Sequence, residues 1–308
     1  MRSCVRNDPC NPFELDISDV FRISIFVFKM EGRQKPTNPF NVCSSGIHEK
    51  RRERGMVLLA ERHGPALKMV PHLTLSRFRE QTRSITHFFG TRRGPDYGGS
   101  SGELGTVKAA EPDFPEVVSV KQVHGTDVLI LDRPVQVGEK FMEGWDAILT
   151  NQPNLLVTVR TADCVPVLLA DPKQRIVGMV HAGWRGAVHG IVPKTLQRMA
   201  EHFGCAVESI QMAIGPSAGP CCYEVDGPVI ESLQSHFSDW ASVLTMHGPH
   251  VGKFNLKELV CRQALETGVV REQIQTLNLC TICRPEQFFS YRREGTGHGT
   301  MVSGIMLN

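Results

Sequence analysis

Two apolar segments joined by a polar turn, within Thr161 to Gly186, constrain the fold of this chain more than any other feature. The first segment, Val165 to Ala170, is apolar apart from its proline, and the second is Arg175 to Val180. The residues between them, DPKQ, have the composition of a turn, so the sequence predicts a β-hairpin. A hairpin returns its second strand to the start of its first. We therefore expect Cys164 and His181 to lie side by side.

A second histidine, His124, lies at the end of another segment rich in β-branched residues, Val117 to Val123. Val128 to Leu131 is apolar as well, so we expect two strands with His124 in the connection between them. A single histidine at a strand end is more often structural than catalytic. With Cys164 and His181, however, it completes a set of two imidazoles and one thiolate, which leaves one zinc coordination position open. These three residues are the predicted active site.

Five motifs resemble those of the laccase-domain, or YfiH-like, family: KQVHGTDV, RTADCVPVLLAD, VHAGWRGAVHGIV, AIGPSAGPCCYEV and FFSYRREG. The resemblance runs from about Met69 to the C-terminus. Members of the family have been described as multicopper polyphenol oxidases, purine nucleoside phosphorylases and peptidoglycan editing factors. The resemblance implies a metal site formed by His124, Cys164 and His181.

Zinc held by two imidazoles and a thiolate lowers the pKa of a bound water towards ~7. Such a site suits hydrolytic attack, including attack on C6 of adenine with loss of ammonia. Phosphorolysis of a nucleoside needs a firmly held phosphate instead, because the C1′–N bond breaks towards a cationic sugar. Arginines bind phosphate through forked hydrogen bonds, and we predict Arg185 (in HAGWRG) and Arg292 (in SYRR) for this role. For Arg185, a structural ion pair is an equally good interpretation.

The function predicted on this basis is that of a purine nucleoside phosphorylase, which converts adenosine or inosine and phosphate to the free base and ribose 1-phosphate. S-methyl-5′-thioadenosine is a further candidate substrate, and adenosine deaminase activity is predicted at the same site. Zinc is the predicted cofactor and copper the alternative. These activities, and a homodimeric state, are what the resemblance implies; the spacing of the residues by itself indicates only a metal site.

Three other interpretations stay open. A multicopper oxidase needs many histidines, typically in HxH pairs, and the 12 histidines of the chain form no such pair. A blue-copper centre would need a weak axial methionine; Met179 shares a strand face with His181, although core packing explains it as well. A cytoplasmic hydrolase that edits peptidoglycan precursors could use the same metal to cleave an amide. A metal-binding or redox-sensing protein that uses Cys164 is the non-enzymatic alternative.

Charge and hydropathy exclude several classes of protein. With a net charge of +2, the chain lacks the basic excess expected of a protein that binds nucleic acid or an anionic membrane. No apolar run approaches the ~18 residues of a membrane span. The N-terminal apolar run, Val20 to Phe28, is interrupted by Arg22, which makes it a poor secretory signal. We therefore expect a cytoplasmic protein.

The ten cysteines are irregularly spaced, and a chain of this size does not need disulfides to be stable. Most of them are expected to be thiols that pack as small apolar groups. Cys280 and Cys283 form one CxxC motif, and Cys221 and Cys222 are adjacent. A structural zinc shared among these four is one interpretation; core or loop thiols are the favoured one.

The remaining pattern predicts a single mixed α/β domain, with mixed β-sheets flanked by helices, over residues 69–308. Hydrophobic residues make up 41% of the chain, enough to fill a sizeable core. Residues 1–68 lack sustained periodicity and are predicted to be a loosely structured extension. Because Met56 and Met69 both precede plausible starts, part of this extension is interpreted as a mis-assigned upstream segment, which the intact mass of the natively expressed protein would test.

Local signals place several elements of this domain. A helix is expected to start at Pro193, another after Asp226 as N-cap, and a third after Asn255, which forms a capping box with Glu258. Strands are expected at Gln211 to Ile214, Ile274 to Leu279, Phe288 to Tyr291 and Met301 to Leu307. Two further residues, Asp146 and Asp163, flank the predicted site in sequence. Each is interpreted either as a carboxylate that orients a metal-bound imidazole or as a turn residue.

Overall fold

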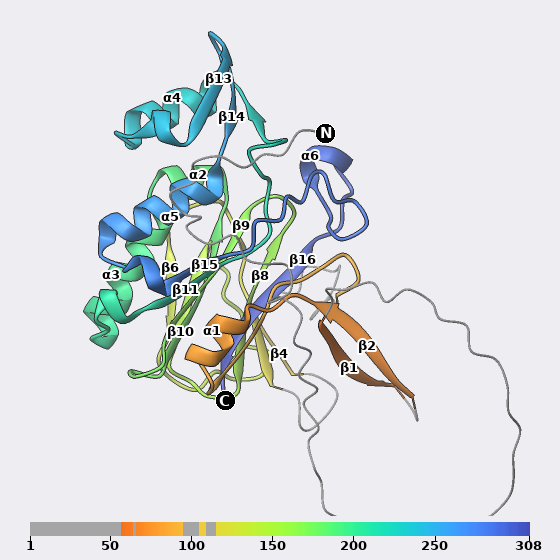
Figure 1. The fold of residues 1–308 in the computed structure, drawn as a ribbon. Coiled ribbons are helices and arrows are strands. Elements are labelled where there is room, and N and C mark those ends of the chain that lie inside the picture. The colour runs from red at the N-terminus through yellow and green to blue at the C-terminus, as the bar shows by residue number, and fades with distance from the viewer. Residues whose placement is uncertain (1–56, 64–65, 95–104, 109–114) are drawn as a thin grey trace, which may run out of the picture.

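The computed structural model describes residues 57–63, 66–94, 105–108 and 115–308. Two β-sheets pack face to face, and helices cover the outer face of the larger sheet (Figure 1). This layered arrangement confirms the predicted mixed α/β class.

The larger sheet has six strands in the order β15-β11-β9-β10-β7-β6. They are β6 (Val128–Leu131), β7 (Ala147–Thr150), β9 (Val165–Asp171), β10 (Ile176–Ala182), β11 (Gln211–Ile214) and β15 (Ile274–Thr276). The β6–β7 and β11–β15 pairs are parallel and the others antiparallel. The central strands β9 and β10 are buried along their whole length. Because both of their faces are covered, their sequences are apolar throughout instead of alternating.

The second sheet has five strands in the order β3-β16-β8-β5-β4. They are β3 (Ile85–Phe88), β4 (Gly105–Lys108), β5 (Glu116–Ser119), β8 (Leu155–Thr161) and β16 (Met301–Leu307). One hydrophobic core fills the space between the sheets, with Leu168 and Met179 on one side and Val157 and Ile305 on the other. Each such side chain contributes about 1.5–3 kcal/mol by its burial.

The helices pack on the outer face of the six-stranded sheet around a second hydrophobic core (Figure 1). They are α2 (Trp184–Val188), α3 (Ile191–Phe203), α4 (Gly227–His236) and α5 (Leu256–Thr267), and the short α1 (Ser76–Gln81) and α6 (Tyr291–Glu294) lie elsewhere. A three-stranded sheet of β12 (Glu224–Val225), β13 (Leu244–Gly248) and β14 (Val251–Phe254) adjoins α4. Single 3₁₀ turns occur at Val207–Ser209, Trp240–Ser242 and Arg271–Gln273.

The helix starts predicted after Asp226 and Asn255 agree with the structure in position, whereas the helix predicted to start at Pro193 begins earlier, at Ile191. Pro193 lies in the first turn of α3. The side chain of Asn255 accepts a hydrogen bond from the backbone N–H of Glu258 at 3.2 Å, which confirms one half of the predicted capping box. Glu258 itself pairs with Arg262 (Nε–Oε1 2.6 Å). Asp226 occupies the N-cap position of α4, although its side chain makes no capping hydrogen bond.

Three predicted strands differ from the structure, and one of them, Ile274 to Leu279, is a strand only as far as Thr276. The segment Phe288 to Tyr291 is not a strand, since α6 begins at Tyr291 and the hydroxyl of Ser290 caps it by accepting from Arg293 N at 3.2 Å. The strand predicted for Val117 to Val123 ends at Ser119. Moreover, β5 and β6 belong to different sheets, so the segment that carries His124 crosses from one sheet to the other.

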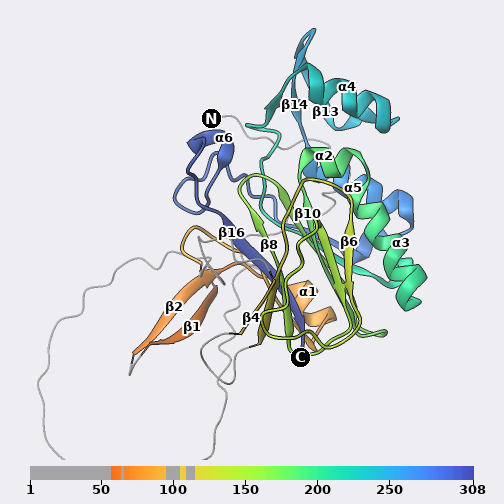
Figure 2. The same cartoon turned by 180° about the vertical axis from the view of Figure 1, so that it is seen from behind.

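A β-hairpin precedes the main body, with β1 (Val57–His63) antiparallel to β2 (Ala66–His72). It extends away from the helices (Figure 2). The predicted domain boundary at residue 69 falls inside its second strand. The predictions for residues 1–56 lie outside the described part of the chain.

Candidate active site

The β9–β10 hairpin brings Cys164 and His181 together, as predicted. In its register, His181 lies opposite Pro166 and Ala182 opposite Val165, so Cys164, one residue before β9, adjoins the end of β10. The turn is held by Asp171, whose Oδ1 accepts from two backbone N–H groups of the turn at 3.0 Å each. The apolar strands and the polar turn thus align the two side chains.

His124 reaches the same place from the segment that crosses between the sheets. The carboxylate of Asp146, fully buried just before β7, accepts hydrogen bonds from the backbone N–H groups of Val123 (3.2 Å), His124 (3.0 Å) and Gly125 (2.7 Å). His124 has a φ of 60°, a conformation that non-glycine residues rarely adopt. The three hydrogen bonds from backbone N–H groups to the carboxylate of Asp146 hold His124 in this conformation.

Two glycines of the HAGWRG motif allow this crossing segment to approach the hairpin. A Cβ on Gly183 would lie 2.5 Å from Cδ2 of His124 and 3.2 Å from Sγ of Cys164. A Cβ on Gly186 would lie 2.5 Å from the carbonyl oxygen of Gly125. Any side chain at either position would therefore push His124 away from Cys164.

One donor atom each from His124, Cys164 and His181 lies within 4.8 Å of the others, and these residues form what we call the His-Cys-His site. Nε2 of His124 is 3.7 Å from Sγ of Cys164. Nδ1 of His181 is 2.7 Å from Oδ1 of Asp146, which leaves Nε2 of His181 for the site. A carboxylate on the outer nitrogen of an imidazole is the usual arrangement for a metal-ligating histidine, so the donor set fits a metal ion.

Asp146 therefore acts as the orienting carboxylate, one of the two interpretations of its position in the sequence. Burial raises the pKa of Asp146, but the hydrogen bonds from His181 and from the backbone of Gly125 outweigh burial and hold this pKa below its usual value. The carboxylate is thus charged, and its charge favours a positively charged partner on the far side of His181.

Cys164 and His181 stabilise each other's charged forms. Burial alone would raise the pKa of the Cys164 thiol, but the imidazolium of His181 and the hydrogen bond with His124 lower it to about 6. Burial would likewise lower the pKa of His181, but the thiolate of Cys164 and the hydrogen bond to Asp146 raise it to about 9. A thiolate is the form of cysteine that binds metals. His181 is buried, Cys164 is half-buried and His124 is exposed, so the site opens to solvent on the His124 side.

Both predicted arginines lie near this site, and Arg292 contacts Tyr223, a residue for which the sequence motifs predicted no role. Arg185 is exposed in the first turn of α2, with Cζ 4.4 Å above the ring of Trp184. Arg292 lies in α6, where Nη1 donates to Glu224 O at 2.7 Å and Cζ is 5.2 Å from the ring of Tyr223. Burial and the thiolate of Cys164 raise the pKa of Tyr223 to about 12 against the opposing charges of both arginines. Among the described residues, neither arginine forms an ion pair.

Asp163 does not orient an imidazole, and instead ties the C-terminal loops to the site. Its φ is 94°, and its carboxylate is buried and accepts from Thr281 Oγ1 (2.6 Å), Ser290 Oγ (2.9 Å) and Arg292 N (2.7 Å). Nor is it the turn aspartate of the alternative interpretation, since these partners lie more than one hundred residues away. Asp163, the residue before Cys164, thereby connects the His-Cys-His site to α6 and to the loop that precedes α6.

The region that contains these residues, 106–308, matches the family model described as multi-copper polyphenol oxidoreductase laccase. The chain belongs to this family. The identification from the five sequence motifs is thereby confirmed.

Three of the named proteins that this chain resembles illustrate the similarity. Human purine nucleoside phosphorylase LACC1 is 31% identical over 189 residues, which are 61% of this chain and 43% of the human protein. A purine nucleoside phosphorylase of Bacteroides thetaiotaomicron is 36% identical over 200 residues, 63% of this chain and 74% of the relative. Adenosine deaminase RL5, from an unknown prokaryotic organism, is 33% identical over 201 residues, 63% and 76% respectively. The match thus spans less than half of the human relative.

The fold is also found in a solved structure. YlmD from Geobacillus stearothermophilus superposes with a TM-score of 0.65 and 24% identity, covering 82% of this chain and 99% of YlmD. In the described part of this chain, no helix combines the length and the apolar character that a membrane crossing requires.

Proposed function

We propose that this laccase-family protein is a purine nucleoside phosphorylase with adenosine deaminase activity, and that His124, Cys164 and His181 bind its metal ion. The observation that carries the proposal is the convergence of these three donors, with His181 held by the charged carboxylate of Asp146. The names of the human, Bacteroides and RL5 relatives support purine nucleosides as the substrate class.

Zinc is the metal that we propose for this site, with copper as the alternative. Two imidazoles and one thiolate leave a tetrahedral zinc with one position for a reacting group. A blue-copper centre would need an axial ligand such as methionine, but Met179 belongs to the hydrophobic core between the two sheets. When bound, zinc would supply a Lewis acid beside the substrate.

For phosphorolysis, we assign Arg185 and Arg292 to the phosphate. In this reaction the C1′–N9 bond of the nucleoside breaks, a phosphate oxygen bonds to C1′, and the purine leaves with a proton. The forked guanidinium groups of arginine fit the phosphate oxygens. A phosphate bound in this way would also stabilise the positive charge that develops on the sugar. We also assign Tyr223, whose ring lies 5.2 Å from Cζ of Arg292 and whose raised pKa keeps its hydroxyl protonated, as a further hydrogen-bond donor to the phosphate.

The proposal is tested by incubating the purified full chain with adenosine, with and without phosphate, while zinc and copper are quantified. Adenine and ribose 1-phosphate that form only with phosphate would support phosphorolysis, and inosine would support deamination. Replacing Arg185 or Arg292 by Gln should raise the KM for phosphate, whereas Arg198→Gln, a partly exposed arginine of α3 that pairs with Glu201, serves as the matched control. A zinc-loaded protein without turnover would contradict the proposal and favour amide hydrolysis of peptidoglycan precursors or binding without catalysis.

Two further parts of the proposal concern the protein as a whole. We propose a cytoplasmic location, because six of the seven cysteines of the described part are free thiols, and free thiols persist in a reducing compartment. We also propose a homodimer, on the family resemblance alone. Its mass in solution would test this directly.

A further inference from the structure

Two loops meet at one edge of the six-stranded sheet, next to the His-Cys-His site. Strands β11 and β15 are parallel neighbours, with Ile214 opposite Thr276, so the loops that follow them leave the sheet at the same edge. Ser217 and Cys280 continue this pairing as an isolated parallel bridge. The first loop carries the adjacent pair of cysteines and the second carries the CxxC motif.

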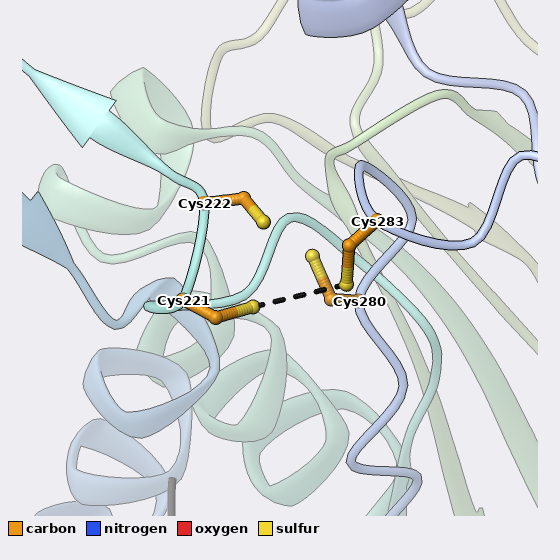
Figure 3. Close-up of side chains that lie close together, drawn as sticks. All are labelled: Cys221, Cys222, Cys280 and Cys283. Atoms are coloured by element: carbon orange, nitrogen blue, oxygen red, sulfur yellow. Dashed lines mark hydrogen bonds between the residues drawn. The ribbon is translucent and has the colours of Figure 1, made fainter. Parts of the chain in front are cut away.

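The four cysteines of these loops form what we call the thiol cluster: Cys221, Cys222, Cys280 and Cys283. Their sulfur atoms all lie within 4.8 Å of one another, and their side chains point toward a common centre (Figure 3). Sγ of Cys221 is 4.0 Å from Sγ of Cys283. In a tetrahedral site with zinc–sulfur bonds of about 2.3 Å, the sulfur atoms lie roughly 3.8 Å apart, a spacing that small side-chain rotations would reach.

The backbone around Cys280 is arranged for a thiolate. Its sulfur accepts a hydrogen bond from the N–H of Gly219 at 3.3 Å and from the N–H groups of Ile282 and Cys283. Amides of a CxxC turn that point at the first sulfur stabilise a negatively charged ligand. Gly219 can approach because it lacks a side chain, since a Cβ there would lie 3.0 Å from Cβ of Cys280 and 3.4 Å from its sulfur.

Two cationic side chains hold the carbonyl groups of the CxxC loop. Nη1 of Arg293 donates to the carbonyls of Thr281 and Ile282 at 2.7 Å each. The buried ammonium group of Lys257 donates to Leu279 O at 3.0 Å. Four thiolates around a divalent ion carry a net negative charge, which neighbouring cations offset.

The favoured sequence interpretation, core or loop thiols, does not account for this arrangement. Cys221 and Cys283 are exposed, so they do not serve as apolar filling for a core. Loop thiols without a ligand would have no reason to converge from two segments about sixty residues apart in sequence. A disulfide would join two of the sulfur atoms and leave the other two without a role.

We propose that Cys221, Cys222, Cys280 and Cys283 bind a structural zinc ion, which displaces the thiol protons on binding. The ion would clip the two loops together and thereby fix the residues that follow them. Tyr223 directly follows the adjacent pair, and the CxxC loop is tied to Asp163 through Thr281. This inference does not depend on the reaction that the His-Cys-His site performs.

The test is the zinc content of the full chain and of single variants, each reconstituted with zinc under reducing conditions. Wild type should hold about two zinc ions per chain, and Cys283→Ser should lose about one of them. Cys205→Ala, which changes a free cysteine outside both sites, is the matched control and should lose none. In Cys164→Ala, the zinc that remains should have four sulfur neighbours at about 2.3 Å by X-ray absorption.

The outcomes separate zinc binding from its alternatives. Equal zinc content in wild type and Cys283→Ser would overturn the proposal, as would a disulfide between two of the four cysteines in protein purified without oxidant. If Cys283→Ser is insoluble, the X-ray absorption of Cys164→Ala decides, and nitrogen or oxygen neighbours there would exclude a four-thiolate site. If Cys283→Ser lost the zinc of the thiol cluster but retained phosphorolysis, the result would support the zinc site and would not contradict the proposed function.

Discussion

The His-Cys-His site and the thiol cluster lie at the same edge of the six-stranded sheet but are built differently. The first offers three donors that range from buried His181 to exposed His124, with a buried carboxylate behind one imidazole. The second offers four sulfur donors, and its support consists of backbone amides and cations that bind carbonyl groups. Three ligands leave one position for a reacting group, whereas four thiolates saturate a tetrahedral zinc. The number of donors, more than their chemical type, distinguishes a site for catalysis from one for stability.

The largest predicted effect is on turnover. Removing one cysteine from the His-Cys-His site should mainly slow turnover, whereas removing one from the thiol cluster should mainly lower stability. Cys164→Ala removes a ligand of the proposed catalytic metal, and a loss of several kcal/mol of transition-state stabilisation corresponds to at least ~10³-fold slower turnover. Cys283→Ser is expected to lower the midpoint of thermal unfolding by several degrees and to slow turnover far less. Adenosine phosphorolysis and calorimetry on both variants check this. Similar losses of turnover in the two variants would contradict the assignment of catalysis to the His-Cys-His site and of stability to the thiol cluster.

In the reduced, metal-free protein, the thiol of Cys164 should also react about 10²-fold faster at pH 7 than the thiol of Cys222. The pKa of Cys164 is lowered to about 6, so its thiolate predominates at pH 7 and is lost as the pH falls through 6. Burial raises the pKa of Cys222 to about 11, so its thiolate is scarce until far higher pH. The thiolate fractions differ by about 10⁴-fold, and the lower nucleophilicity of the more acidic thiol offsets roughly half of these decades. Iodoacetamide labelling, followed by peptide mass spectrometry from pH 5 to about 10, measures both profiles. Faster labelling of Cys222 at pH 7 would contradict the assignment of the thiolate to Cys164.

The orienting carboxylate is tested by Asp146→Asn, which keeps the shape of the side chain and removes its charge. We expect metal to bind the His-Cys-His site about 10–100-fold more weakly, because the neutral amide no longer supports a positive charge beyond His181. The zinc of the thiol cluster should be unchanged. Competition with a chromophoric chelator measures the affinity, and Asp127→Asn, an exposed aspartate paired with Lys194, is the control. If both variants retained the wild-type affinity, Asp146 would have only a structural role.

The sequence predicted the His-Cys-His site because most of its geometry is local. The β9–β10 hairpin needs only a short turn between two apolar segments, and it places Cys164 beside His181 without any other part of the fold. The position of His124 was harder to anticipate. Its segment crosses between two sheets, and only the family motif, not the strand pattern, indicated that it returns to the hairpin.

The local sequence did not predict the convergence of the thiol cluster, because its geometry is long-range. It depends on the parallel pairing of β11 with β15, whose short segments carry no signal of which strand lies next to which. The strand wrongly predicted at Phe288 to Tyr291 has the same origin. Its aromatic character was outweighed by capping from Ser290 and by the hydrogen bond from Arg292 N to Asp163, a residue far away in sequence.

The smallest predicted effect concerns Asp163, which connects the two sites and limits how far they can be treated as separate. Asp163→Asn is suited to the test because asparagine tolerates the positive φ of this position. The substitution removes the negative charge of the carboxylate, which accepts three hydrogen bonds. We expect the free energy of unfolding to fall by about 1–3 kcal/mol, with both metal sites still formed. Turnover should fall modestly, since α6 and Arg292 lose one anchor without losing a ligand. Urea denaturation and zinc analysis measure these effects, with the exposed Asp239→Asn as control. If Asp163→Asn emptied the thiol cluster as well, the two sites would have to be described as one cooperative unit held by this carboxylate.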